Sequence, residues 1–120
     1  GKLVIDYDKH RVYVEGQDAG LTQNEFRLLS LLGKYAGKVL TYDYMMKEIW
    51  GPNMKGDNRI LRVNMANIRR KIEKNPGQPQ FIFTEVGVGY RIIETNMLWN
   101  ILGYWKTGGL RCGQQYFVII

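Results

Sequence analysis

Residues 57–74, DNRILRVNMANIRRKIEK, decide the fold because they predict one amphipathic helix. An apolar stripe recurs at offsets of 0, 4, 7 and 11, the spacing with which a helix covers a core: Leu61, Met65, Ile68 and Ile72. At about 100° per residue, the opposite face carries Arg59, Val63, Ala66 and Arg70, flanked by Arg62 and Asn67. Small side chains framed by arginines favour close approach to a phosphate-lined groove, such as the DNA major groove.

Positive charge is concentrated on the same helix. Residues 59–74 contain six basic side chains and one acid, Glu73, a local balance of +5 in a chain whose formal net charge is +6. Such a concentration favours a directed contact with a polyanion. The alternative interpretation is an ordinary solvated helix face that carries arginines and lysines. Charge alone leaves both interpretations open.

Length and composition predict one small domain and exclude several classes of function. At 120 residues and 45% hydrophobic content, the chain can bury a modest core. The single cysteine, Cys112, permits no internal disulfide and is consistent with a reducing cytoplasm. It lies far from the single histidine, His10, so we expect no metal site and no cofactor. Neither a membrane-spanning run nor a catalytic motif is present, and we expect no membrane association and no enzyme.

The first half of the chain predicts short strands followed by two helices. Leu3, Ile5 and Tyr7 alternate onto one face, a turn follows at residues 8–10, and a short extended piece lies between Gly16 and Gly20. A T-x-x-E capping box at residues 22–25 starts an apolar helix that ends at Gly37. Thr41 caps a shorter second helix, which ends at residues 51–52. Its predicted inward side holds Met45, Met46, Ile49 and Trp50.

The second half predicts a recognition helix and a wing. Asp57 is placed to cap the basic helix. Residues 81–93, FIFTEVGVGYRII, predict a hairpin in which Gly87 and Gly89 permit a tight turn. Together the elements predict an α+β winged helix-turn-helix, with three helices, an N-terminal antiparallel sheet and a C-terminal β-hairpin wing.

At this point the sequence resembles the OmpR/PhoB family of response-regulator output domains. The matching segments are LTQNEFRLLSLL, GKVLT, EIWG, LRVNMANIRRKIE and TEVGVGYR, in the family's order over residues 3–94. The wording of the last two segments is most similar to KdpE-type regulators of potassium-transport genes. The resemblance implies sequence-specific binding of double-stranded DNA in a two-component transcriptional system of the cytoplasm. The alternative function is a winged-helix protein-interaction module that docks an acidic partner.

The resemblance also implies partners. Domains of this family are joined to an N-terminal receiver with a phosphorylatable aspartate, and we expect the receiver to be missing from this chain. They bind direct repeats as head-to-tail dimers. They recruit RNA polymerase through the loop before the recognition helix, here residues 52–56. The alternative interpretation of that loop is a plain solvated connector.

Carried over by position, the resemblance implies two sets of DNA-binding residues. The base-reading and groove-lining set is Ile60, Arg62, Val63, Ala66 and Asn67. The phosphate-contacting set is Trp50, Arg59, Asn64, Arg69, Thr84 and Tyr90, and Arg70 on the same basic helix completes the expected interface. Independently, an arginine can fork onto guanine, an asparagine can pair with adenine, and a valine suits a thymine methyl group. Trp50 has the alternative role of a core aromatic.

The wing departs from the family pattern. Many relatives place an arginine immediately before the G-x-G-Y turn, where it enters the minor groove, but this chain has Val86 there, preceded by Glu85. Minor-groove reading by the wing is therefore in doubt. Arg91 lies beyond the turn, and we expect it to stay on the strand.

We expect residues 1–94 to form the DNA-binding domain and residues 95–120 an atypical hydrophobic tail. The tail has no acidic residue and matches nothing in the family. One interpretation is a non-native extension, for instance from an altered reading frame; the other is an added dimerisation or packing element. Relatives have an additional strand beside the one predicted at Leu3, so this sheet edge would be open. Residues 116–120, YFVII, suit that edge, in the same or a neighbouring molecule.

Overall fold

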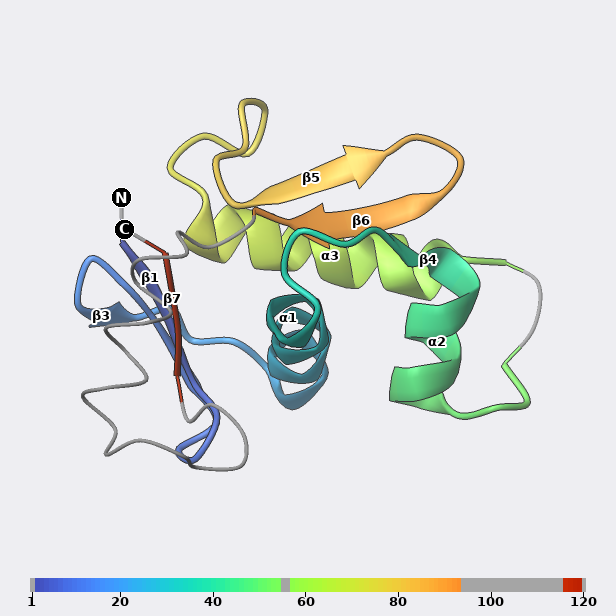
Figure 1. Cartoon of the computed structure of the whole chain (residues 1–120), viewed down its shortest axis with the longest axis horizontal. Coiled ribbons are helices and arrows are strands. Elements are labelled where there is room, and N and C mark those ends of the chain that lie inside the picture. Colours follow the sequence, from blue (N-terminus) through green and yellow to red (C-terminus); the bar gives the residue numbers. More distant parts are fainter. Residues whose placement is uncertain (1, 55–56, 94–115, 120) are drawn as a thin grey trace.

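Two antiparallel sheets and three helices make up the fold of the computed structural model, which describes residues 2–54, 57–93 and 116–119. In chain order the elements are β1 (Leu3–Asp6), β2 (Arg11–Val14), β3 (Gln17–Asp18), α1 (Gln23–Lys34), β4 (Leu40–Thr41), α2 (Tyr42–Trp50), α3 (Arg59–Ile72), β5 (Ile82–Glu85), β6 (Gly89–Ile92) and β7 (Tyr116–Ile119). Figure 1 shows the β5–β6 hairpin lying along α3, with α1 and α2 on the other side of that helix. The predicted winged helix-turn-helix is confirmed.

The helix starts follow the capping signals in the sequence, with one correction. Thr22 accepts from the backbone N–H of Glu25, whose carboxylate accepts from that of Thr22, so the predicted capping box is present. Thr41 caps α2 through the N–H of Tyr44. The prediction for α3 was wrong by one residue. Asn58 is its N-cap, without a side-chain cap bond, while Asp57 accepts from the N–H of Arg59 at 2.7 Å.

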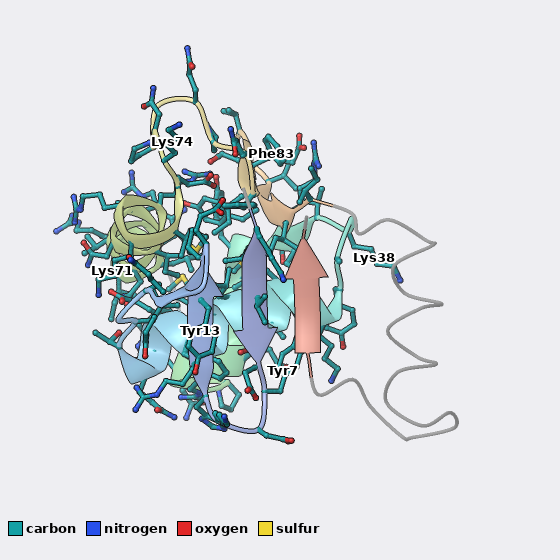
Figure 2. The ribbon with its side chains drawn as sticks, turned by 90° about the vertical axis from the view of Figure 1, so that its left-hand side faces the viewer. Tyr7, Tyr13, Lys38, Lys71, Lys74 and Phe83 are labelled. Carbon is teal, nitrogen blue, oxygen red and sulfur yellow. The ribbon has the colours of Figure 1, made fainter. Side chains whose placement is uncertain are left out.

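The core forms where the three helices meet the two sheets. The predicted stripe of α3 is buried along its whole length, from Leu61 to Ile72. Phe26, Leu28 and Leu29 of α1 join the same core, together with Leu3 and Ile5 of β1. The N-terminal sheet stands in front of α1 when it is viewed face on (Figure 2). One continuous core therefore fixes α3 with its opposite face toward solvent.

The wing belongs to a three-stranded sheet in the order β4-β6-β5. Gly87 has a φ of 76° at the hairpin turn, as expected from its position. Gly89 has a different role from the one predicted, because it is the first residue of β6 and pairs with Thr41 of β4. A Cβ atom on Gly89 would lie 1.8 Å from the carbonyl oxygen of Leu40. Glycine is thus required there for close approach of two strands.

The N-terminal sheet has the order β3-β2-β1-β7, so the end of the chain lies beside its beginning (Figure 1). β7 pairs antiparallel with β1, from Leu3 opposite Ile119 to Asp6 opposite Tyr116. The expectation that the tail's end covers this edge is confirmed for residues 116–119, within the same molecule. The rest of the tail, residues 95–115 and 120, lies outside the described residues.

Candidate nucleic-acid interface

The solvent face of α3 presents the predicted base-reading residues together. Arg62 and Ala66 are exposed, and Val63 and Ile60 are exposed by 54% and 39%. Asn67 is half-buried on the flank of the same face. The first turn of α3 contains no acid, and its last turn holds Arg69, Arg70 and Lys71. The solvent face therefore has small or apolar residues along its centre, with the exposed arginines Arg59, Arg62 and Arg70 around them.

Two asparagines on this face already have hydrogen-bond partners. Asn64 Nδ2 donates to the carbonyl oxygen of Ile60 at 2.8 Å, which holds its side chain against the helix. Arg70 Nη2 donates to Asn67 Oδ1. Bidentate reading of adenine uses both the oxygen and the nitrogen of an amide. Arg70 therefore competes with adenine for one of the two lone pairs of Asn67 Oδ1.

Arg59 lies beside a carboxylate at the start of the helix. Its Nη2 is 3.1 Å from Asp57 Oδ2, and both side chains are largely exposed. The backbone N–H of Arg59 also donates to Asp57 Oδ1, so it is not free to bind a phosphate. Exposed ion pairs contribute little to stability, so a phosphate can compete for the guanidinium at small cost.

Three residues predicted to contact phosphate meet at the junction of α3 and the wing. Arg69 Nη2 donates to Thr84 Oγ1 at 2.6 Å and to the carbonyl oxygen of Ile82 at 3.2 Å. Its guanidinium also lies over the ring of Tyr90, 5.5 Å from the centroid. Arg69 Nε is buried and has no hydrogen-bond partner among the described residues. Arg69 is thus bound to the wing rather than extended into solvent.

Tyr90 is a core residue with only 4% of its surface exposed. Burial raises the pKa of its hydroxyl, and nearby Tyr42 adds to this, whereas Arg69 and Arg62 act in the opposite direction. The hydroxyl therefore stays protonated and able to donate.

Trp50, at the end of α2, is half-buried and packs against the core, which favours its alternative role as a core aromatic.

The tip of the wing is apolar. Val86 is 90% exposed and Val88 is half-exposed, at the turn where the family pattern has a cation. Arg91 stays on β6, as expected, with its Nε 2.9 Å from Glu85 Oε1 and its guanidinium over the ring of Phe83. Figure 2 shows Phe83 on the hairpin, above the N-terminal sheet. The arginine nearest the tip is thus engaged on the strand.

Two acids hold the basic helix in place in a way that was not predicted from the sequence. Glu25 is buried and lies 2.7 Å from Lys71 Nζ (Figure 2 labels Lys71). Glu73 is buried at the end of α3 and accepts hydrogen bonds from backbone N–H groups of residues 80–82. The only signal in the sequence was that Glu73 is the lone acid in a basic stretch. Across the described residues, no helix is long and apolar enough to cross a membrane.

Comparisons with known proteins agree with this geometry. Residues 16–92 match the family model described as "Transcriptional regulatory protein, C terminal". The chain is 36% identical over 91 residues to the KDP operon transcriptional regulatory protein KdpE of Escherichia coli, covering 76% of this chain and 40% of that one. This chain thus spans well under half the length of that relative.

Solved structures of response regulators are similar in fold. The response regulator DrrB of Thermotoga maritima, an OmpR/PhoB homologue, matches with a TM-score of 0.71 and 32% identity over 78% of this chain and 42% of that one. The RstA DNA-binding domain of Klebsiella pneumoniae, solved in complex with the RstA box, has a TM-score of 0.71 and 28% identity. That match covers 78% of this chain and 92% of the RstA domain. The chain therefore belongs to the OmpR/PhoB family of response-regulator output domains, which bind DNA to regulate transcription and are not enzymes.

Proposed function

We propose that this domain recognises a specific duplex sequence by placing α3 in the major groove. The observation that carries the proposal is the solvent face of α3, where exposed Val63 and Ala66 lie beside exposed Arg62. A major groove about 12 Å wide admits a helix, and small central side chains let its backbone come close to the base edges. Arg62 would read guanine, Val63 a thymine methyl group, and Asn67 an adenine once Arg70 has turned to a phosphate.

The remaining predicted residues would position the domain on the backbone. Arg59 and Arg70 are exposed, one near each end of the helix. Asn64 and Thr84 offer neutral donors, and Arg69 approaches phosphate only through the part of its guanidinium that Thr84 and Ile82 leave free. Tyr90 is buried and Trp50 is half-buried, which limits any phosphate contact to their polar edges. We assign these two a minor share of the affinity.

Partners follow from the family and from similarity to KdpE. The domain would bind direct repeats as a head-to-tail dimer and would act with a receiver domain in a longer protein. Control of potassium-transport genes is the regulatory role that the KdpE similarity favours. Residues 52–56 would contact RNA polymerase; Lys55 and Gly56 of this loop lie outside the described residues. Beside this loop lies a cavity of about 280 Å³, lined in part by Met54, Asn58 and Val88, which could receive a side chain of the polymerase.

Selection of bound sequences from a pool of random duplexes tests this proposal. We expect one consensus that occurs twice in the same orientation, and a steep fall in affinity as salt concentration rises. The same measurement with a scrambled duplex is the control. Equal affinity for all duplexes, or no affinity for DNA together with binding of an acidic protein, would overturn the proposal in favour of the protein-docking alternative.

A further inference from the structure

The end of α3 is tied to the start of the wing by one carboxylate. Glu73 follows the last residue of α3, and only 6% of its surface is exposed. Its oxygens accept from the N–H of Gln80 at 2.7 Å, of Phe81 at 3.1 and 3.2 Å, and of Ile82 at 2.9 Å. Three successive N–H groups thus converge on one side chain. The intervening loop is closed through Glu73.

One helical turn earlier, Arg69 binds the same strand as a hydrogen-bond donor, whereas Glu73 binds it as an acceptor. Its Nη2 donates to the carbonyl oxygen of Ile82 and to the hydroxyl of Thr84. Ile82, the first residue of β5, therefore has its N–H bound by Glu73 and its C=O bound by Arg69. Residues four apart share a helix face, so the two side chains can reach one strand together.

Glu73 and Arg69 provide hydrogen-bond partners for backbone groups of an edge strand. β5 lies at the edge of the sheet ordered β4-β6-β5, and among the described residues no strand neighbours its outward backbone groups. Such groups must be paired or solvated, and here Ile82 is fully buried. Charged partners form shorter and stronger hydrogen bonds than neutral ones. α3 therefore takes the place of a further strand at this point.

We propose that Glu73 and Arg69 are positioning residues that fix the wing relative to α3, and so determine whether the wing reaches DNA when α3 is in the groove. Thr84 lies two residues beyond Ile82 on β5. The contacts of Glu73 and Arg69 with Ile82 therefore set the distance of Thr84 from the helix. Glu73 is buried against the hairpin and acts without touching DNA. The inference rests on the proposed function, because it concerns the geometry of that complex.

Hydroxyl-radical footprinting of the full chain on its selected duplex tests the inference. Glu73→Gln keeps the size of the side chain, but its amide nitrogen faces N–H donors and leaves at least one of them unpaired. Arg69→Lys keeps the positive charge, but its shorter side chain cannot place a donor where Arg69 Nη2 contacts both Ile82 and Thr84. Glu48→Gln, at an exposed position of α2, is the control that removes the same charge.

We expect both variants to retain protection in the major groove and to lose protection at the sugars beside the wing. Affinity should fall about tenfold, the usual worth of two neutral hydrogen bonds. Thr84→Ala should lower the DNA affinity of the otherwise wild-type protein but should have little further effect on the affinity of Glu73→Gln. A general loss of stability would not produce this coupling between the two substitutions. Thermal melts identify a temperature at which each variant is folded.

Two results would overturn the inference. One is an unchanged wing footprint in folded Glu73→Gln and Arg69→Lys. The other is an equal cost of Thr84→Ala in both backgrounds. Failure of the wild-type chain to select any duplex would instead contradict the proposed function. If Glu73→Gln does not fold, Arg69→Lys decides the question alone, because it keeps the Glu73 contacts.

Discussion

Arg59, Arg62 and Arg69 lie on one helix and carry the same charge, but their surroundings differ. Arg59 faces solvent beside Asp57, Arg62 is exposed next to Val63, and Arg69 is bound to the wing. A phosphate contact and a base contact have different consequences when they are lost, since only the second carries sequence information. The three residues should therefore be separable by measurement.

Arg62→Ala is expected to relax the preference for one base and to cost about 1–3 kcal/mol of binding free energy, the usual size of a lost bidentate base contact. Competition binding against every single-base variant of the selected duplex measures both effects. A uniform loss of affinity for all duplexes would assign Arg62 to the phosphate backbone instead.

Arg59→Ala is expected to weaken binding to every duplex alike. Without this phosphate contact, binding releases about one counterion fewer. The slope of log K against log salt should therefore flatten by about 0.9. Asp57→Asn is a useful comparison because it removes the local competitor and should leave the slope unchanged or steeper. An unchanged slope in Arg59→Ala would show that this guanidinium does not meet the backbone. Arg69 is unsuited to the same test because its loss also releases Thr84.

The partly buried ion pair between Glu25 and Lys71 should make stability depend on pH. Burial alone would raise the pKa of Glu25, but hydrogen bonds from Lys71 and Thr22 and the charge of Lys71 outweigh it and hold the pKa below its usual value. A lowered pKa means that the pair stabilises the fold above the carboxyl's unfolded pKa, near 4. That stabilisation disappears as pH falls through the folded pKa.

Glu25→Gln should therefore lower the free energy of unfolding at pH 7 by about 1–2 kcal/mol, since Lys71 is one-third exposed and screened by water. The difference from wild type should shrink toward pH 3. Urea denaturation at several pH values measures it, and a constant difference across that range would contradict the assignment.

Helix α3 has two faces with separate tasks, and one substitution can distinguish them. Ala66 is exposed in the free domain, so Ala66→Glu should leave the thermal transition in place. In the complex it would bring a negative charge into a closely fitted, phosphate-lined groove, and we expect DNA binding to be abolished. Gln23→Glu, an exposed change of similar charge on α1, is the control. Retained binding by folded Ala66→Glu would mean that another face of the domain docks on DNA.

Elements with local signals could be predicted from the sequence. The capping box at Thr22 and the apolar stripe of α3 each depend on residues within one or two turns, where geometry follows from spacing. Contacts between distant segments could not be predicted. Nothing near Gly89 indicates that β4 will pass against it, and nothing near Glu73 indicates that three N–H groups will return to it.

The same distinction applies to the candidate interface. The exposed residues of α3 were found by periodicity, because the helix phase fixes which face meets solvent. The engagement of Arg69 with Thr84, and of Asn67 with Arg70, depends on side-chain packing that no spacing encodes. These contacts change what the residues can do: Arg69 becomes part of the support for the wing.

The molecule as a whole is closed by pairing of its two ends. β1 lies between β2 and β7, and without β7 its backbone groups would form an exposed edge of the N-terminal sheet. Exposed edges promote pairing with other chains. This sheet lies on the far side of α1 from α2, and none of the predicted DNA-binding residues belongs to it (Figure 1).

A chain truncated after Glu94 is therefore expected to keep its DNA affinity but to lose stability or to associate through the open β1 edge. Size-exclusion chromatography and thermal melts of both lengths measure these effects. Identical behaviour would show that the tail is inert. A truncated chain that folds but does not bind DNA would give the tail a role at the interface.

An engineered disulfide between β1 and β7 can test whether β7 pairs with β1 of the same molecule in solution. Val4 lies opposite Val118 in the β1–β7 register, and opposed residues of antiparallel strands are about 4.5–5.5 Å apart at Cα, within disulfide range. In a Cys112→Ser background, Val4→Cys with Val118→Cys should therefore oxidise to a cross-linked monomer. Val4→Cys with Tyr116→Cys, two residues out of register, should oxidise far more slowly. A cross-linked dimer would show instead that the strand pairs with β1 of a second copy, and absence of any cross-link would show that β7 does not occupy the edge.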